Sequence, residues 1–173
     1  HAHAQGMVHR DVKPGNILLQ AGHAVVGDFG IARALTEAGR EELTGTGVAI
    51  GTLKYMSPEQ ATAEGPVDER TDVYALGCVL YEMLAGEAPF APGSAQAVLA
   101  RKLTQAPPDV RTTRSDVPLS VAAVLDQALA RDPNQRCPAP GELAAALSDL
   151  PSFSSERVPT SRARLGSFKR RTR

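Results

Sequence analysis

The sequence predicts a mainly α-helical unit with one small β-hairpin. Residues 70–84 are apolar almost all round and are followed by Gly86, a residue type that commonly ends helices. A helix without a polar face belongs in a core, so we expect residues 70–84 to be buried. Apolar residues also recur at helical spacing in three further segments, which we expect to be amphipathic helices: residues 94–104, 118–130 and 141–150.

The shorter elements have local signals of their own. Two apolar runs, residues 17–19 and 24–26, flank a turn at Gly22 and predict the hairpin. Residues 31–56 lack periodicity and are rich in Gly, Thr and Glu, so we expect a long loop there. A proline near its start predicts a short helix over residues 58–63.

The composition is that of an ordinary soluble domain, with 42% hydrophobic residues, 22% charged residues and 19 basic against 19 acidic side chains. The charges are unevenly placed, because residues 151–173 are rich in Lys, Arg, Ser and Pro and predict a basic, disordered tail or linker. Binding to a phosphate-rich partner or an acidic lipid surface is the alternative for this tail. Residues 1–150 are expected to form one folded unit.

The sequence predicts a cytoplasmic chain. Cys78 and Cys137 are too few for a disulfide framework, and no Cys-x-x-Cys zinc spacing occurs. The longest apolar run, residues 73–81, is too short for a membrane helix, although sequence beyond Arg173 could tether the chain to a membrane. Because the chain begins with His1, with neither Met nor a leader, we expect it to be a fragment.

The most informative stretch is His9-Arg10-Asp11-Val12-Lys13-Pro14-Gly15-Asn16, which is followed by Asp28-Phe29-Gly30. It contains a carboxylate that can receive a hydroxyl proton, Asp11, and a nearby cation, Lys13. Asn16 and Asp28 add oxygen atoms of the kind that Mg²⁺ prefers. An isolated Asp in a loop usually caps a turn, but this set at this spacing predicts phosphoryl transfer.

These residues resemble the catalytic and magnesium-binding loops of eukaryotic-type protein kinases. Ser57-Pro58-Glu59 resembles the family's Ala-Pro-Glu segment, residues 72–77 the start of its central helix, and Arg136 its helix-anchoring arginine. The Ser-Pro-Glu spelling and Gly51-Thr52 look most like the bacterial serine/threonine kinases. The resemblance covers residues 1–150 and implies a protein-kinase-like fold (α+β), of which this chain holds only the mainly α-helical C-terminal lobe. The family's ATP-clamping small lobe would lie upstream.

The resemblance assigns chemical roles to single residues. Asp11 would accept or orient the substrate hydroxyl, Lys13 would offset charge on the transferring phosphate, and the Thr52 hydroxyl would bridge the two. The resemblance implies that four residues bind ATP and its metal ion: Lys13, Leu18, Asn16 and Asp28. Leu18 would form part of the adenine floor, and Asn16 and Asp28 would bind Mg²⁺.

Regulatory and supporting roles follow from the same resemblance. Arg10 would bind a phosphate carried by Thr44 or Thr46 of the loop. Glu59 and Arg136 would form a buried ion pair, and Asp72 would accept hydrogen bonds from catalytic-loop amides. The residues implied as structural supports are His9, Phe29, Glu59, Asp72 and Arg136.

The function implied by the resemblance is transfer of the ATP γ-phosphate to Ser or Thr of protein substrates, with Mg²⁺ as cofactor. A second kinase copy would be the partner for trans-autophosphorylation, and no nucleic-acid partner is expected. Small-molecule kinases have a related loop, but they lack Lys13 and the Ser-Pro-Glu segment. The main alternative is a non-enzyme, an inactive kinase lobe that acts as a docking or decoy module. Without a small lobe, the chain alone is expected to be inactive.

Overall fold

The structure, a computed structural model, describes residues 2–28, 50–63, 65–91 and 93–149. Phe29, Thr44, Thr46 and the basic tail lie outside these residues. The described elements, in chain order, are η1 (His3–Gln5), η2 (Pro14–Asn16), β1 (Ile17–Gln20), β2 (His23–Val26), α2 (Ile50–Leu53), α3 (Pro58–Thr62), α4 (Arg70–Ala85), α5 (Ala95–Thr104), η3 (Val110–Thr112), α6 (Leu119–Ala128), η4 (Pro133–Gln135) and α7 (Pro140–Ser148).

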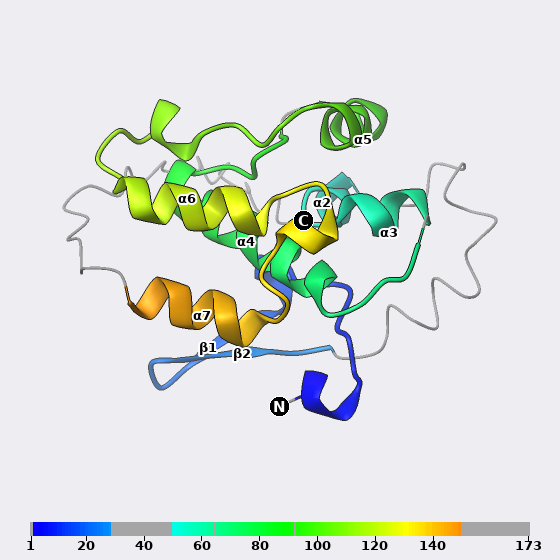
Figure 1. Ribbon diagram of the computed structural model, residues 1–173, viewed down its shortest axis with the longest axis vertical. Coiled ribbons are helices and arrows are strands. Elements are labelled where there is room, and N and C mark those ends of the chain that lie inside the picture. The colour runs from blue at the N-terminus through cyan, green and yellow to red at the C-terminus, as the bar shows by residue number, and fades with distance from the viewer. Residues whose placement is uncertain (1, 29–49, 64, 92, 150–173) are drawn as a thin grey trace, which may run out of the picture.

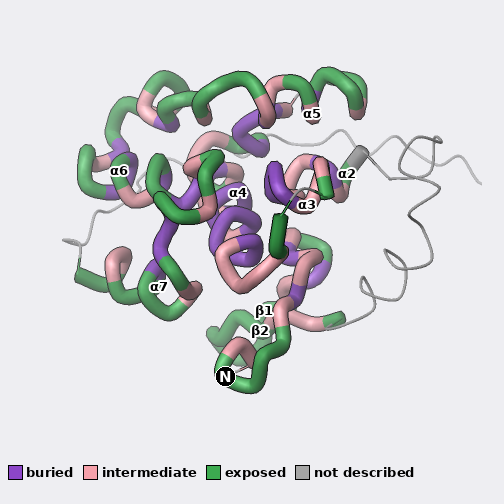
Figure 2. The backbone as a smooth tube through the Cα atoms, turned by 45° about the vertical axis from the view of Figure 1, so that its right-hand side comes forward, coloured by how far each residue is buried: buried purple, intermediate pink, exposed green. Residues whose placement is uncertain are grey.

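Helix α4 runs through the middle of the molecule, as its continuous apolar sequence predicts (Figures 1 and 2). Val73 and Cys78 on this helix are completely buried. Helices α6 and α7 pack against α4 and against each other. The approach of α6 is close at Gly77, where a Cβ atom would lie only 3.0 Å from the Ala128 Cβ. Glycine at this position therefore allows the two helices to pack.

Capping residues set the ends of several helices. The Ser57 hydroxyl accepts a hydrogen bond from the Gln60 amide, and the Gln60 side chain accepts one from the Ser57 amide, so α3 begins with a capping box. Ser94 caps α5 by accepting from the Ala97 amide. Helix α4 ends at Gly86, whose φ of 89° lies in the left-handed region that favours glycine.

Strands β1 and β2 form the predicted antiparallel hairpin, in which Ile17 pairs with Val26 and Gln20 with His23. Figure 1 shows the hairpin at the edge of the helical body, and Figure 2 shows that much of it is exposed. Leu18 and Leu19 of β1 are 62% and 82% exposed. Helices α6 and α7 cover much of α4, whereas Met83 on α4 is 70% exposed.

The expectation of a loop over residues 31–56 is wrong at its end, because Ile50–Leu53 forms the short helix α2. Four residues are too few to show a helical period, and this helix packs against α5 instead. The first turn, η1, is a 3₁₀-helix that ends at Gly6 with φ of 72°. Among the described residues, no helix is long and apolar enough to span a membrane.

Candidate active site

The N-terminal turn of α4 anchors the loop that contains Asp11. The carboxylate of Asp72 is 2% exposed and accepts hydrogen bonds from the backbone amides of His9 and Arg10, both at 2.8 Å. The ring of His3 contributes a third bond to Asp72, from Nε2 at 2.7 Å. A buried carboxylate is costly unless it is hydrogen-bonded, so these contacts account for the burial of Asp72. They also fix residues 9 and 10 against the central helix.

His9 joins this loop to the segment that leads to Asp28. Its Nε2 lies 2.7 Å from the carbonyl oxygen of Gly27, and its Nδ1 accepts a hydrogen bond from the Asp11 amide at 3.2 Å. A carbonyl only accepts, so Nε2 carries the ring proton and Nδ1 is the acceptor. The neighbouring Arg10 has φ of 67°, and Asp28 has φ of 60°. Positive φ in two non-glycine residues is the kind of backbone strain that concentrates at functional sites.

Asp11 lies at the centre of a hydrogen-bonded cluster. Lys13 Nζ donates to Asp11 Oδ2 at 2.7 Å, and Asn16 Nδ2 donates to the same oxygen at 3.0 Å. Asn16 Nδ2 also bonds the Asp11 carbonyl at 2.8 Å. Both described bonds to the carboxylate thus go to Oδ2, which leaves Oδ1 to meet a substrate hydroxyl. The side chains of Asp11 and Lys13 are 23% and 27% exposed, so a substrate can reach them.

Thr52 on α2 completes the cluster from a distant part of the chain. Its hydroxyl accepts a hydrogen bond from Lys13 Nζ at 3.3 Å. Lys13 therefore contacts both Asp11 and Thr52, and Thr52 meets Asp11 through the lysine. A shallow hollow beside this cluster is lined by Arg10, Asp11, Val12, Thr52, Tyr55, Met56 and Ala75.

Asn16 and Asp28, the two predicted magnesium ligands, lie at the same end of the hairpin. Ile17 pairs with Val26, and just beyond that pair the Gly27 amide donates to the Asn16 carbonyl at 2.8 Å. Because Asn16 Nδ2 is directed toward Asp11, its Oδ1 is the atom free to bind a cation. Asp28 is exposed, and its carboxylate is the kind of charged oxygen group that Mg²⁺ prefers. Within the described part of the chain, no group of three or more His, Cys, Asp or Glu side chains could hold a metal ion.

The residues that were predicted to be regulatory or to contact adenine are described only in part. The Arg10 carbonyl accepts a hydrogen bond from Gln60 Nε2 at 2.8 Å, which ties the catalytic loop to α3. Leu18 is an exposed residue of β1 and lies two residues from Asn16, on the hairpin rather than in the helical core.

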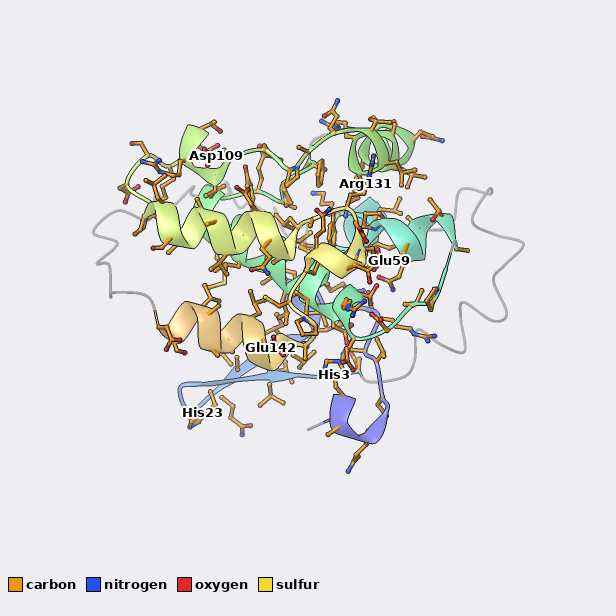
Figure 3. All side chains as sticks on the ribbon, viewed as in Figure 1. His3, His23, Glu59, Asp109, Arg131 and Glu142 are labelled. Atoms are coloured by element: carbon orange, nitrogen blue, oxygen red, sulfur yellow. The ribbon has the colours of Figure 1, made fainter. Side chains whose placement is uncertain are left out.

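The expected ion pair between Glu59 and Arg136 is present and buried. The guanidinium donates two hydrogen bonds to the carboxylate, at 2.7 and 2.9 Å. Burial by itself would raise the pKa of Glu59, but the hydrogen bonds and charge of Arg136 outweigh it and lower the pKa below its usual value. Thr71 donates a further bond to Glu59 at 2.9 Å. Figure 3 shows Glu59 close to the side of the molecule where α3 lies.

Sequence reasoning missed two contacts that support the site. One is the bond from His3 to Asp72, since a single histidine in a turn has no local signal of its partner. His23 lies at the hairpin turn, apart from His3 (Figure 3). The other is the bond from the Tyr55 hydroxyl to Glu82 Oε2 at 2.5 Å. Burial and this bond raise the pKa of Tyr55 above its usual value.

Comparison with known proteins identifies the family of the chain. Residues 1–146 match the family model described as "Protein kinase domain". The chain is 46% identical over 147 residues to the serine/threonine-protein kinase PknB of Mycolicibacterium smegmatis, covering 84% of this chain and 23% of that protein. It is 45% identical over 153 residues to the serine/threonine-protein kinase PknJ of Mycobacterium tuberculosis, covering 84% and 25%.

The chain thus spans about a quarter of the length of these curated relatives. The family match covers every element from η1 to the larger part of α7, and it includes the Asp11 cluster. On this match, the chain belongs to the protein kinase family, and its relatives are of the bacterial serine/threonine type.

Proposed function

We propose that the protein containing this chain is a serine/threonine protein kinase that transfers the γ-phosphate of ATP to protein substrates. The observation that carries the proposal is the cluster of Asp11, Lys13, Asn16 and Thr52. Asp11 Oδ1 is placed to accept the proton of an incoming hydroxyl, and Lys13 places a positive charge within 2.7 Å of the same carboxylate. This arrangement serves a reaction in which positioning and charge stabilisation do most of the work.

ATP and Mg²⁺ are the cofactors that the site fits. Bound Mg²⁺ would neutralise charge on the nucleotide phosphates, and Asn16 Oδ1 with the Asp28 carboxylate would hold it. Lys13 would face the transferred phosphate, and Leu18 would contact the adenine. The register of the hairpin supports this arrangement, because Ile17, which lies between Asn16 and Leu18, pairs with Val26, two residues before Asp28.

A serine or threonine acceptor is favoured over tyrosine. In the family that the motif resembles, a lysine at the position of Lys13 is typical of serine/threonine kinases, and the two relatives compared above are named as such. The substrates would be proteins, and a second copy of the kinase would be the partner for trans-autophosphorylation of Thr44 or Thr46. We place this reaction in the cytoplasm.

The chain would work together with an ATP-binding small lobe. The exposed apolar residues Leu18, Leu19 and Val25 support this, because an uncovered apolar surface on a hairpin is typical of an interface. We expect the isolated chain to lack kinase activity, since none of its described lysines is placed to clamp the ATP phosphates from the other side.

The test is to express the complete kinase domain, meaning this chain joined to the upstream residues of its gene, and to measure phosphate transfer from ATP. Peptides that differ only in carrying Ser, Thr or Tyr as acceptor should be compared at several Mg²⁺ concentrations. Transfer to Ser and Thr that requires Mg²⁺ is expected. A complete domain that binds partner proteins but transfers no phosphate would be a docking module, and the proposal would be wrong.

A further inference from the structure

Lys102 on α5 is a buried lysine whose amine faces backbone carbonyl groups. The residue is 2% exposed. Its Nζ donates to the carbonyl oxygen of Lys54 at 2.9 Å and to that of Met56 at 2.6 Å. It also lies 4.9 Å from the ring centre of Tyr74 and 5.9 Å from that of Phe90. Within the described residues, the Lys102 amine thus contacts carbonyl dipoles and aromatic faces rather than a carboxylate.

Burial of a lysine in a core costs free energy. Removing an ammonium group from water disfavours its charged form, and burial accordingly lowers the pKa of Lys102. A methionine of similar length would fill the same space without this cost. What a methionine could not supply is the pair of hydrogen bonds to residues 54 and 56. The specific contribution of Lys102 is therefore to hold the backbone of this segment.

The segment held by Lys102 adjoins the catalytic cluster. It begins two residues after Thr52, whose hydroxyl accepts a hydrogen bond from Lys13. The amides of Tyr55 and Met56 both donate to the Thr52 carbonyl, at 3.1 and 3.2 Å, so residues 52–56 form one tight turn. Tyr55 and Met56 also line the hollow next to Asp11. A shift of this turn would therefore move the wall of the site at which a substrate hydroxyl meets Asp11.

Helix α5, which carries Lys102, is itself held in place next to this turn. Helix α5 packs against α2 and α3, the elements on either side of residues 54–56, and Figure 1 shows the three helices grouped together. At the end of α5, Arg131 donates to the Leu103 carbonyl at 2.7 Å. Tyr55 is held separately by Glu82 of α4. The turn is thus fixed to α4 through the side chain of Tyr55, and to α5 through the backbone carbonyl groups of residues 54 and 56.

We propose that Lys102 is a positioning residue for the polypeptide substrate, which it serves by fixing the backbone of residues 54–56 beside Asp11. The proposal rests on the proposed kinase function and concerns only the acceptor side of that reaction. ATP and Mg²⁺ would be held at Asn16 and Asp28, on the hairpin end of the site. Loss of the Lys102 contacts should therefore lower the rate of phosphate transfer to a peptide and leave the rate of ATP hydrolysis unchanged.

The experiment compares three variants in the complete kinase domain. Lys102→Met removes the donors and keeps the length of the side chain, whereas Lys102→Arg keeps a charged donor. Arg101→Met is the matched control, because it removes a cation from the same helix whose Nε bonds the Ala97 carbonyl of α5 itself. For each variant, kcat and KM are measured for a peptide and for ATP, together with ATP hydrolysis in the absence of peptide and the melting temperature.

We expect Lys102→Met to lower the peptide kcat/KM by about 10- to 100-fold, mainly through KM, as for loss of hydrogen bonds from a charged donor. ATP hydrolysis and the KM for ATP should stay at the wild-type level, and Lys102→Arg should recover most of the loss. A peptide kcat/KM in Lys102→Met equal to that of Arg101→Met would overturn the proposal. A parallel fall of both activities would also overturn it, by showing a merely structural role. A wild-type domain without either activity would instead refute the kinase function itself.

Discussion

The guanidinium of Arg136 binds the carboxylate of Glu59 through two parallel hydrogen bonds, across 77 residues of sequence. Arg136 also donates to the carbonyl oxygens of Arg70, Ala130 and Arg131, and it lies 4.9 Å from the Tyr74 ring centre. This one side chain therefore joins α3, the start of α4 and the segment after α6. Because α3 follows the turn held by Lys102, the ion pair also fixes the segment that comes directly after this turn.

Removal of Arg136 should strongly destabilise the fold. In Arg136→Met, the buried Glu59 carboxylate loses its partner, and we expect the free energy of unfolding in urea to fall by about 3 to 5 kcal/mol. Arg70→Met is the matched control, since its guanidinium makes an exposed hydrogen bond to Asn134, and it should cost less than about 1 kcal/mol. Equal losses in the two variants would contradict the role of the buried pair.

The ion pair between Glu59 and Arg136 should also make the free energy of unfolding depend on pH. The pKa of Glu59 is lowered in the folded state from its usual 4.5, so the unfolded chain binds the proton more readily. The stabilisation is therefore present above pH 4.5 and is lost as the pH falls through the lower, folded pKa. The free energies of unfolding in urea of wild type and Glu59→Gln should differ most near neutral pH, and the difference should become smaller in acid. A difference that grows in acid would contradict the lowered pKa of Glu59.

Asp11→Asn should abolish most phosphate transfer and keep the fold. The change removes a proton acceptor and almost no volume, so kcat on a Ser or Thr peptide should fall by about 100- to 10,000-fold. The melting temperature should match that of Asp116→Asn, a control at an exposed carboxylate that pairs with Arg114. An Asp11→Asn variant that keeps a tenth of the wild-type turnover would exclude the assigned role.

Asp28→Asn should act through the metal. Loss of one unit of negative charge next to Mg²⁺ costs more than about 1.4 kcal/mol even at partly solvated sites, so half-maximal activity should need at least about tenfold more Mg²⁺. The titration is done at fixed ATP, with Asp116→Asn again as control. If the Mg²⁺ dependence stays unchanged while kcat falls, Asp28 is not a metal ligand.

Phosphorylation of Thr44 or Thr46 should activate the kinase through Arg10. A phosphate on either residue offers charged acceptors to the guanidinium, a contact that can order a loop. Mass spectrometry of the active domain should find one of these sites modified, and the Thr44→Ala/Thr46→Ala double variant should lose activity. Arg10→Gln should produce the same loss without reducing the modification. Full activity of the double variant would refute the prediction.

Much of the fold was predictable because its signals are local. The apolar pattern of residues 70–84, the turn at Gly22 and the cap at Ser94 each depend on neighbours in the sequence, and helix α4, the hairpin and helix α5 confirm them. Helix α2 was not predictable in this way. Its four residues have no period to detect, and they lie against α5, which begins more than forty positions later.

The sequence by itself determined which chemical groups this protein brings to a reaction, because Asp11, Lys13 and Asn16 lie within one short loop. Only the tertiary structure decided which distant side chains hold the backbone around them. His3 meets Asp72, and Lys102 meets the turn at residues 54–56, each over a long separation in sequence. Such hydrogen bonds depend on where packing of α4, α5 and the hairpin places each donor, and side-chain identity does not specify that position.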